Sequence, residues 1–214
     1  MSKPNSETKQ KLLICAAEIF MERGYKETTI RMIADRANVN SALISYHFSD
    51  KETLYLQVVR YWAADAFATF PLDHLDDPAA DPEKKVYSFI YHTLLCLFGP
   101  EGSGTGFGRL LAHEALGSPS DMVHMIVSET IGRPTRALTQ AIRQITGIDD
   151  AELLRNYTAC IVGQTVYFYL SRNLTNELLG GPLLQSEMDI RKLSNDIHTF
   201  SMAALENLVF RRQA

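Results

Sequence analysis

The rest of this chain is arranged around the stretch Thr29–Leu54, TIRMIADRANVNSALISYHFSDKETL. Thr29 is a good helix N-cap, and apolar residues then recur on one helical face: Ile30, Ile33, Ala34 and Ala37. The run 38–40, Asn-Val-Asn, breaks this pattern. Because asparagine tolerates a left-handed backbone and caps helices well, the run predicts a tight turn. A second short helix is predicted over 41–48, so the stretch indicates a helix-turn-helix.

Two further helices complete a small head. Ser49 and Glu52 have the spacing of a capping box, which predicts a helix over 51–70 that Pro71 stops. Upstream, apolar residues at helical spacing predict a first helix over 6–23. The expected core of the head consists of Phe20, Ile33, Val39, Ile44 and Phe48.

Small and polar side chains lie on the outer side of the second helix, which can therefore enter a DNA major groove. Candidates for contacts with base edges or thymine methyl groups are Ser41, Ala42, Leu43 and Ser45. Asn40, at the cap of this helix, belongs to the same DNA-binding set. Arg31 is the only long donor in the motif able to bind guanine with two hydrogen bonds. An ordinary pair of packed helices would show the same periodicity.

The chain resembles the TetR family of bacterial transcriptional regulators in this stretch. The matching positions are Thr29, Ile33, Ala34, Val39, Ala42, Ile44, Tyr46, His47, Phe48, Lys51, Glu52 and Leu54. It departs from the family at Asn38, where glycine is usual, and at Ser45, where an aromatic residue is common. Residues 113–127 and 133–150 resemble, more loosely, the CecR-like C-terminal domain of one TetR subgroup.

This resemblance implies particular contacts and partners. Tyr46, His47 and Lys51, with the helix start at Thr29, are expected to contact DNA phosphates. The alternatives are a capped surface histidine at His47 and simple solvation of Lys51. The helical body is expected to hold a small-molecule effector and to form a homodimer that binds a double-stranded DNA operator.

Composition agrees with a basic head on an acidic body. The chain has 214 residues, 46% of them hydrophobic, and a formal net charge of −4. Residues 1–51 hold eight lysines and arginines against six acids, whereas residues 52–214 hold 13 against 19. Only the head is therefore expected to meet phosphate. We divide the chain into a DNA-binding domain, 1–51, and an effector-binding and dimerisation domain, 52–214.

The remaining helices fill the body. They are predicted over 83–98, 107–116, 120–146, 149–171 and 186–211. Pro134 should kink or restart the third of these. No segment alternates like a strand, so the fold class is all-α with about nine helices.

Two long helices at the end carry more apolar surface than one core needs. From Leu153 one helix presents Tyr157, Ile161 and Phe168 on one face, with Ala159 and Gly163 on another. The apolar residues of the last helix are Ile190, Leu193, Ile197, Phe200, Ala204 and Leu208. We expect both helices to pair with their counterparts in a second chain.

Aromatic, sulfur and polar residues in the body are candidates for an effector pocket, although most must also be core. They are Trp62, Phe67, His92, Cys96, Phe107, His113, Met122, Met125, Tyr157, Gln164 and Phe168. Cys15, Cys96 and Cys160 form no CxxC pair, so neither a disulfide framework nor a zinc site is expected. No apolar run approaches the roughly 20 residues that span a membrane, and the polar N-terminus is no signal peptide. The expected location is the cytoplasm.

Enzymatic functions have little support in the sequence. His92 and Cys96 share a helical face but lack an orienting third group. His113, Glu114 and His124 could bind a metal but lack the HExxH spacing. We therefore expect no catalysis, no metal and no cofactor. The favoured hypothesis is a ligand-responsive regulator, a repressor that a small molecule releases from a palindromic operator. Its rivals are a DNA-binding dimer without effector and a helical enzyme that processes small molecules.

Overall fold

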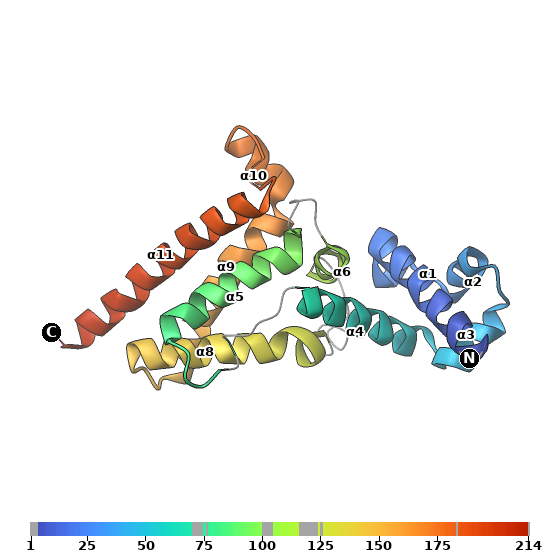
Figure 1. Ribbon diagram of the computed structural model, residues 1–214, viewed down its shortest axis with the longest axis horizontal. Helices are drawn as coiled ribbons and strands as arrows, with labels where there is room; N and C mark the ends of the chain where they lie inside the picture. Colours follow the sequence, from blue (N-terminus) through green and yellow to red (C-terminus); the bar gives the residue numbers. More distant parts are fainter. Residues whose placement is uncertain are drawn as a thin grey trace. The chain divides into compact units, whose positions relative to one another are not determined.

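Helices make up the whole described secondary structure of this protein, in a computed structural model (Figure 1). The structure describes residues 4–69, 75, 77–99, 105–115, 124, 126–182 and 184–213, without the side chains of 4–6, 113–115, 129 and 211–213. Within these ranges there is no strand, and the all-α prediction is confirmed.

The elements follow one another as short and long helices. Their bounds are α1 Pro4–Glu27, α2 Ile30–Ala37, α3 Ser41–Phe48, α4 Lys51–Thr69, α5 Pro82–Phe98, α6 Gly106–Ala115, the π-helix η1 Val127–Ile131, α8 Gly132–Thr146, α9 Ala151–Leu170, α10 Arg172–Leu178 and α11 Glu187–Gln213. The sequence predicted no helix where α10 lies. Pro134 falls in the first turn of α8, directly after η1, and the predicted restart of the helix is confirmed. Its missing N–H is harmless at that position.

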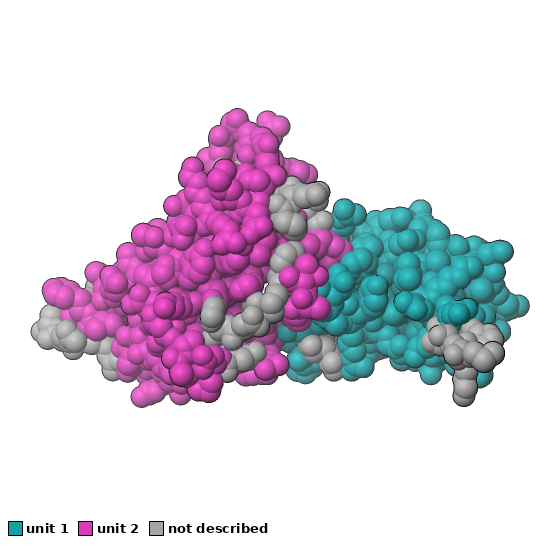
Figure 2. Space-filling view, in the orientation of Figure 1, with its two compact units in different colours: residues 1–65, 109–130 teal, residues 66–108, 131–214 magenta. Residues whose placement is uncertain are grey.

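The chain divides into two compact units (Figure 2). Unit 1 comprises residues 1–65 and 109–130, and unit 2 comprises 66–108 and 131–214. The helices α4 and α6 contribute residues to both units. The functional division at residue 51 remains a proposal.

Unit 1 is built on a continuous apolar core. Of the five predicted core residues, Phe20, Ile33, Ile44 and Phe48 are buried, and Val39 packs half-buried against them. Each such large side chain contributes about 1.5–3 kcal/mol by leaving water. The first part of α4 adds Leu54, Tyr55, Val58 and Val59 to the core. The three helices of the head therefore share their core with α4.

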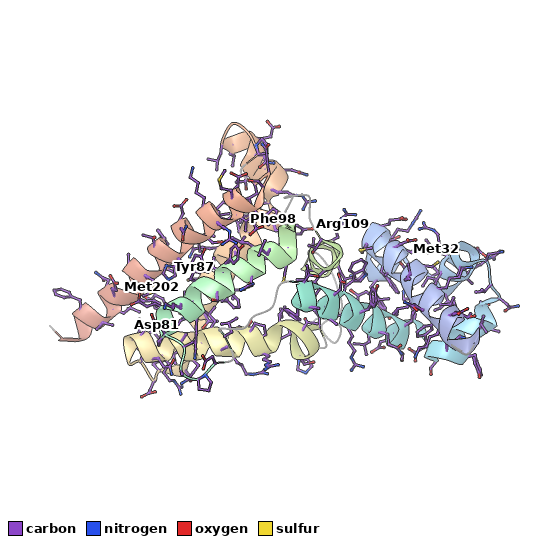
Figure 3. The ribbon with its side chains drawn as sticks, in the orientation of Figure 1. Met32, Asp81, Tyr87, Phe98, Arg109 and Met202 are labelled. Carbon is purple, nitrogen blue, oxygen red and sulfur yellow. The ribbon has the colours of Figure 1, made fainter. Side chains whose placement is uncertain are left out.

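Unit 2 is organised around α5, which packs against α8, α9 and α11. Val86, Ile90 and Leu94 of α5 are fully buried. Figure 3 labels Asp81, whose carboxylate caps the start of α5, and Phe98 at the other end of that helix. The helix α11 is tied to α5 by polar contacts as well: the Tyr91 hydroxyl donates to Oε1 of Glu187 at 2.7 Å.

Candidate nucleic-acid interface

The turn between α2 and α3 has the geometry predicted from its asparagines. Oγ1 of Thr29 accepts a hydrogen bond from the Met32 amide at 3.3 Å, which caps α2. Asn38 is left-handed, with φ 54° and ψ 52°, so asparagine occupies the position where the family usually has glycine. Oδ1 of Asn40 accepts from the Ala42 amide at 2.9 Å and caps α3. Both helices thus begin at the predicted residues.

The predicted capping box at the start of α4 is wrong by one residue. The helix begins at Lys51, and Oδ1 of Asp50 accepts from the Thr53 amide at 2.7 Å. This hydrogen bond lowers the pKa of the Asp50 carboxyl. Ser49 instead lies in the preceding turn with φ 67° and ψ −61°. Both residues can cap a helix, so composition alone does not fix the register.

The helix α3 presents the expected outer side to solvent. Its exposed side chains are Ser41, Ala42, Ser45 and Tyr46. Tyr46 is 73% exposed, whereas Leu43 and His47 are half-buried. Nε2 of His47 is shielded from solvent and has no hydrogen-bond partner among the described residues. The opposite side of α3, with Ile44 and Phe48, is buried in unit 1.

Charged residues around the helix-turn-helix have different surroundings. The side chain of Arg31 is 89% exposed, and its Nε lies 3.9 Å from the Asp35 carboxylate. Such an exposed pair contributes little and leaves Arg31 available to another partner. Arg36, in contrast, binds the carboxylates of Glu18 and Glu22, at 3.4 and 3.0 Å. These ion pairs join α2 to α1, and no pattern in the amino-acid sequence predicted them.

Lys51 is the sequence-predicted residue whose surroundings differ most from expectation. Its Nζ donates to the carbonyl oxygens of Tyr25 and Thr28, both at 2.8 Å. The same nitrogen lies 4.1 Å from the centre of the Tyr25 ring. Burial lowers the pKa of Lys51. The phosphate contact stays a prediction, and the observed contacts lie within the head.

Some of the candidate effector residues lie close together. The rings of Phe67 and Phe107 are 6.2 Å apart, and the buried Cys96 thiol lies 4.0 Å from the Ala66 carbonyl oxygen. His92 lies one helical turn before Cys96 on α5. Burial raises the pKa of Cys96 to about 12, so this thiol stays protonated and is a poor nucleophile at neutral pH.

Other candidates lie elsewhere. Trp62 packs against the core of unit 1, and its buried indole N–H has no hydrogen-bond partner among the described residues. Gln164 donates to the Cys160 carbonyl on α9, and Phe168 is half-buried. Tyr157 lines a surface groove of about 460 Å³ between α9 and α11. Outside the described residues lie Met122, Met125 and the side chains of His113 and Glu114.

The described residues also bear on metal sites and membrane segments. Within their ranges no group of three metal-binding side chains comes together, and His124 is exposed. Among the described helices, none is long and apolar enough to cross a membrane.

Known proteins resemble both parts of the chain. Residues 12–58 match the bacterial regulatory proteins of the tetR family. Residues 82–205, more than half of the chain, match the C-terminal domain of the HTH-type transcriptional dual regulator CecR. CecR of Shigella flexneri is 26% identical over 183 residues, 80% of each chain.

The activator FasR of Mycolicibacterium smegmatis is 44% identical over 57 residues, 27% of this chain. The first three curated relatives are matched over only 26%, 32% and 40% of their own lengths. A crystal structure of FadR from Bacillus subtilis with stearoyl-CoA has a TM-score of 0.64 at 16% identity, covering 90% of this chain and 96% of FadR. The chain belongs to the TetR family of bacterial regulatory proteins and has a C-terminal domain of the CecR type.

Proposed function

We propose that this regulator binds a pseudo-palindromic operator as a homodimer and that a small molecule lowers its operator affinity. The observation that carries this proposal is the outer side of α3. Four exposed small or polar side chains lie on a short helix whose start and preceding turn are fixed by Asn40 and Asn38. A helix held in this way can enter a major groove without rearranging. Because a DNA-binding regulator acts on the chromosome, we also propose a cytoplasmic location.

Each DNA-facing residue has a proposed role. Residues 41–43 and Ser45 contact base edges or thymine methyl groups, and Arg31 reaches a guanine. Phosphate contacts are assigned to the exposed Tyr46 hydroxyl, to His47, and to the helix starts at Thr29 and Asn40. His47 would use Nδ1, because its Nε2 is shielded.

Arg31→Ala tests the base-reading role. It should cost roughly 1–3 kcal/mol at particular base pairs of the operator. Affinities of wild type and variant for single-base operator substitutions measure this loss. Equal losses on every sequence would remove the base-reading role.

The proposed dimer uses exposed parts of α9 and α11. Ile161, Ile190 and Ile197, which their helical spacing offered to a second chain, are buried within their own protomer. Both helices also carry small or aromatic side chains that are exposed, with one asparagine beside them: Ala159, Cys160, Gly163 and Tyr167 on α9, and Phe200, Ala203, Ala204 and Asn207 on α11. We call these eight residues the dimer face. Small residues allow helices from two protomers to pack closely. Phe200 is 69% exposed, and a second protomer would bury its apolar ring.

The effector is proposed to bind within unit 2, near Phe67, Phe107 and Cys96. The helix α4 contributes Trp62 to unit 1 and Phe67 to unit 2, so it can relay a change between them. The aromatic rings of Phe67 and Phe107 suit a largely apolar compound. An acyl-CoA is the first compound to test, because FadR holds one in the same fold.

A DNA footprint with the purified protein on its own upstream region tests the proposal. We expect a protected pseudo-palindrome whose half-sites lie about 34 Å apart, or a multiple of that spacing. Release by an effector should lower operator affinity by about 1–3 kcal/mol. If bound compounds leave operator affinity unchanged, the effector-free dimer is the better description. Repression predicts that transcription of the adjacent gene rises in a deletion strain, and a fall would indicate an activator.

A further inference from the structure

The Lys51 ammonium bridges two segments of the head that are far apart in sequence. It lies at the first residue of α4 and donates to the carbonyl oxygens of Tyr25 and Thr28, both at 2.8 Å. The Tyr25 ring lies beneath it, with the ring centre 4.1 Å from Nζ. An ammonium group has three N–H donors, so these two bonds leave one donor.

The segment that receives these bonds connects α1 to α2. Gly24 leaves helical geometry, with φ 74° and ψ 175°, and the buried Thr28 hydroxyl donates to its carbonyl oxygen at 2.7 Å. The next residue, Thr29, caps α2. Carbonyl groups at the end of a helix lack hydrogen-bond donors within that helix. Lys51, on α4, provides these donors here. The start of α2 is therefore tied to the start of α4.

The aromatic neighbours make this attachment rigid. The Tyr25 ring contacts the Tyr55 ring edge-on at 5.0 Å, and Tyr55 contacts Phe20 at 4.8 Å. Tyr55 lies one helical turn after Lys51 on α4 and is fully buried. Lys51 and Tyr55 thus hold Tyr25 from two successive turns of α4.

We infer that Lys51 is a positioning residue of the DNA-binding head, which fixes α2 and the following α3 relative to α4. The inference rests on the proposed DNA binding by α3. Without the ammonium, residues 24–29 lose their attachment to α4, and α3 samples orientations that fit the operator less well. Specific binding should suffer more than binding to unrelated DNA, which depends on charge rather than on fit.

The test is Lys51→Met in the whole 214-residue chain, with Lys26→Met as the control. Lys26 is exposed and lies beside Tyr25, so its replacement removes the same charge without touching the bridge. Binding to the footprinted operator and to a scrambled duplex is measured over a range of salt concentrations. Lys51→Met should weaken operator binding about tenfold. Its binding to the scrambled duplex, and the slope of log affinity against log salt concentration, should stay nearly unchanged. Loss of a phosphate contact would instead lower that slope by about one unit. Lys26→Met should keep the wild-type ratio of the two affinities.

Amide hydrogen exchange without DNA provides an independent readout. Residues 25–33 should exchange faster in Lys51→Met than in wild type or Lys26→Met, at a temperature where circular dichroism shows all three folded. Should Lys51→Met fail to fold, Lys51→Arg takes its place. It keeps the charge, but its planar guanidinium cannot reproduce the ammonium geometry, so exchange should still rise.

The inference would be overturned if amide exchange in Lys51→Met matched that of wild type. It would also be overturned if Lys51→Met lost equal affinity for both duplexes and its salt slope fell by about one unit. If wild type itself does not discriminate the operator from scrambled DNA, the proposed DNA binding fails. The exchange result still decides whether Lys51 holds the head together.

Discussion

Gly108, near the start of α6, permits a close approach that any side chain would disturb. A Cβ atom at this position would lie 2.4 Å from the Leu97 carbonyl oxygen and 3.0 Å from the Tyr169 ring and hydroxyl. Tyr169 cannot easily move away, because it is 1% exposed and its ring contacts Phe98 at 5.1 Å. The Arg172 guanidinium lies over the same ring, 4.8 Å from its centre.

Two opposing effects set the stability of Gly108→Ala. Alanine favours a helix interior over glycine by about 1 kcal/mol, and less in the first turn. Overpacking against fixed atoms costs about 1–3 kcal/mol. Since the Leu97 oxygen belongs to the backbone of α5, the upper half of that range applies, and the net loss should be about 1–2 kcal/mol.

Urea unfolding of wild type and Gly108→Ala at one protein concentration measures this difference, because the stability of the proposed dimer would depend on concentration. In thermal unfolding the same loss corresponds to roughly 2–8 °C for a chain of this size. A variant as stable as wild type, or more stable, would show that the start of α6 does not pack against α5 and Tyr169 in solution.

Three further changes have outcomes that the structure fixes. Asn38→Ala should destabilise the head by about 1–2 kcal/mol because alanine is strained in the left-handed turn, whereas Asn38→Gly should be neutral; urea unfolding of both variants measures this. Gly163→Leu should raise the dissociation constant of the proposed dimer at least about tenfold in analytical ultracentrifugation with secondary structure intact, because no described atom of its own protomer lies within 4 Å of a Cβ there; an unchanged dimer would exclude this part of the dimer face. Burial and the bond to Glu187 raise the pKa of Tyr91 from 10 to about 12, so its stabilisation is complete below pH 10 and lost as the pH rises through about 12. Thermal unfolding of Tyr91→Phe should lack this alkaline step, and a step of wild-type size would mean that Tyr91 is not its source.

Much of the head follows from rules that act within a few residues. Thr29 and Asn40 cap their helices through amides two or three positions away, and Asn38 adopts the turn that its side chain favours. The periodic apolar residues Ile33 and Ile44 lie on the predicted buried sides for the same reason. The family pattern lies in this stretch, so the amino-acid sequence is sufficient to recognise the helix-turn-helix.

Other features of the fold depend on contacts between residues that lie far apart in the sequence. Lys51 donates to carbonyl groups of residues 23 and 26 positions earlier, and no local pattern announces that contact. On α9, both the face with Ile161 and the face with Gly163 are rich in apolar or small residues, so periodicity could not choose the inner one. Packing in the helical bundle determines which face of α9 is buried, because the larger Ile161 fills space inside the protomer and Gly163 lies on the exposed side.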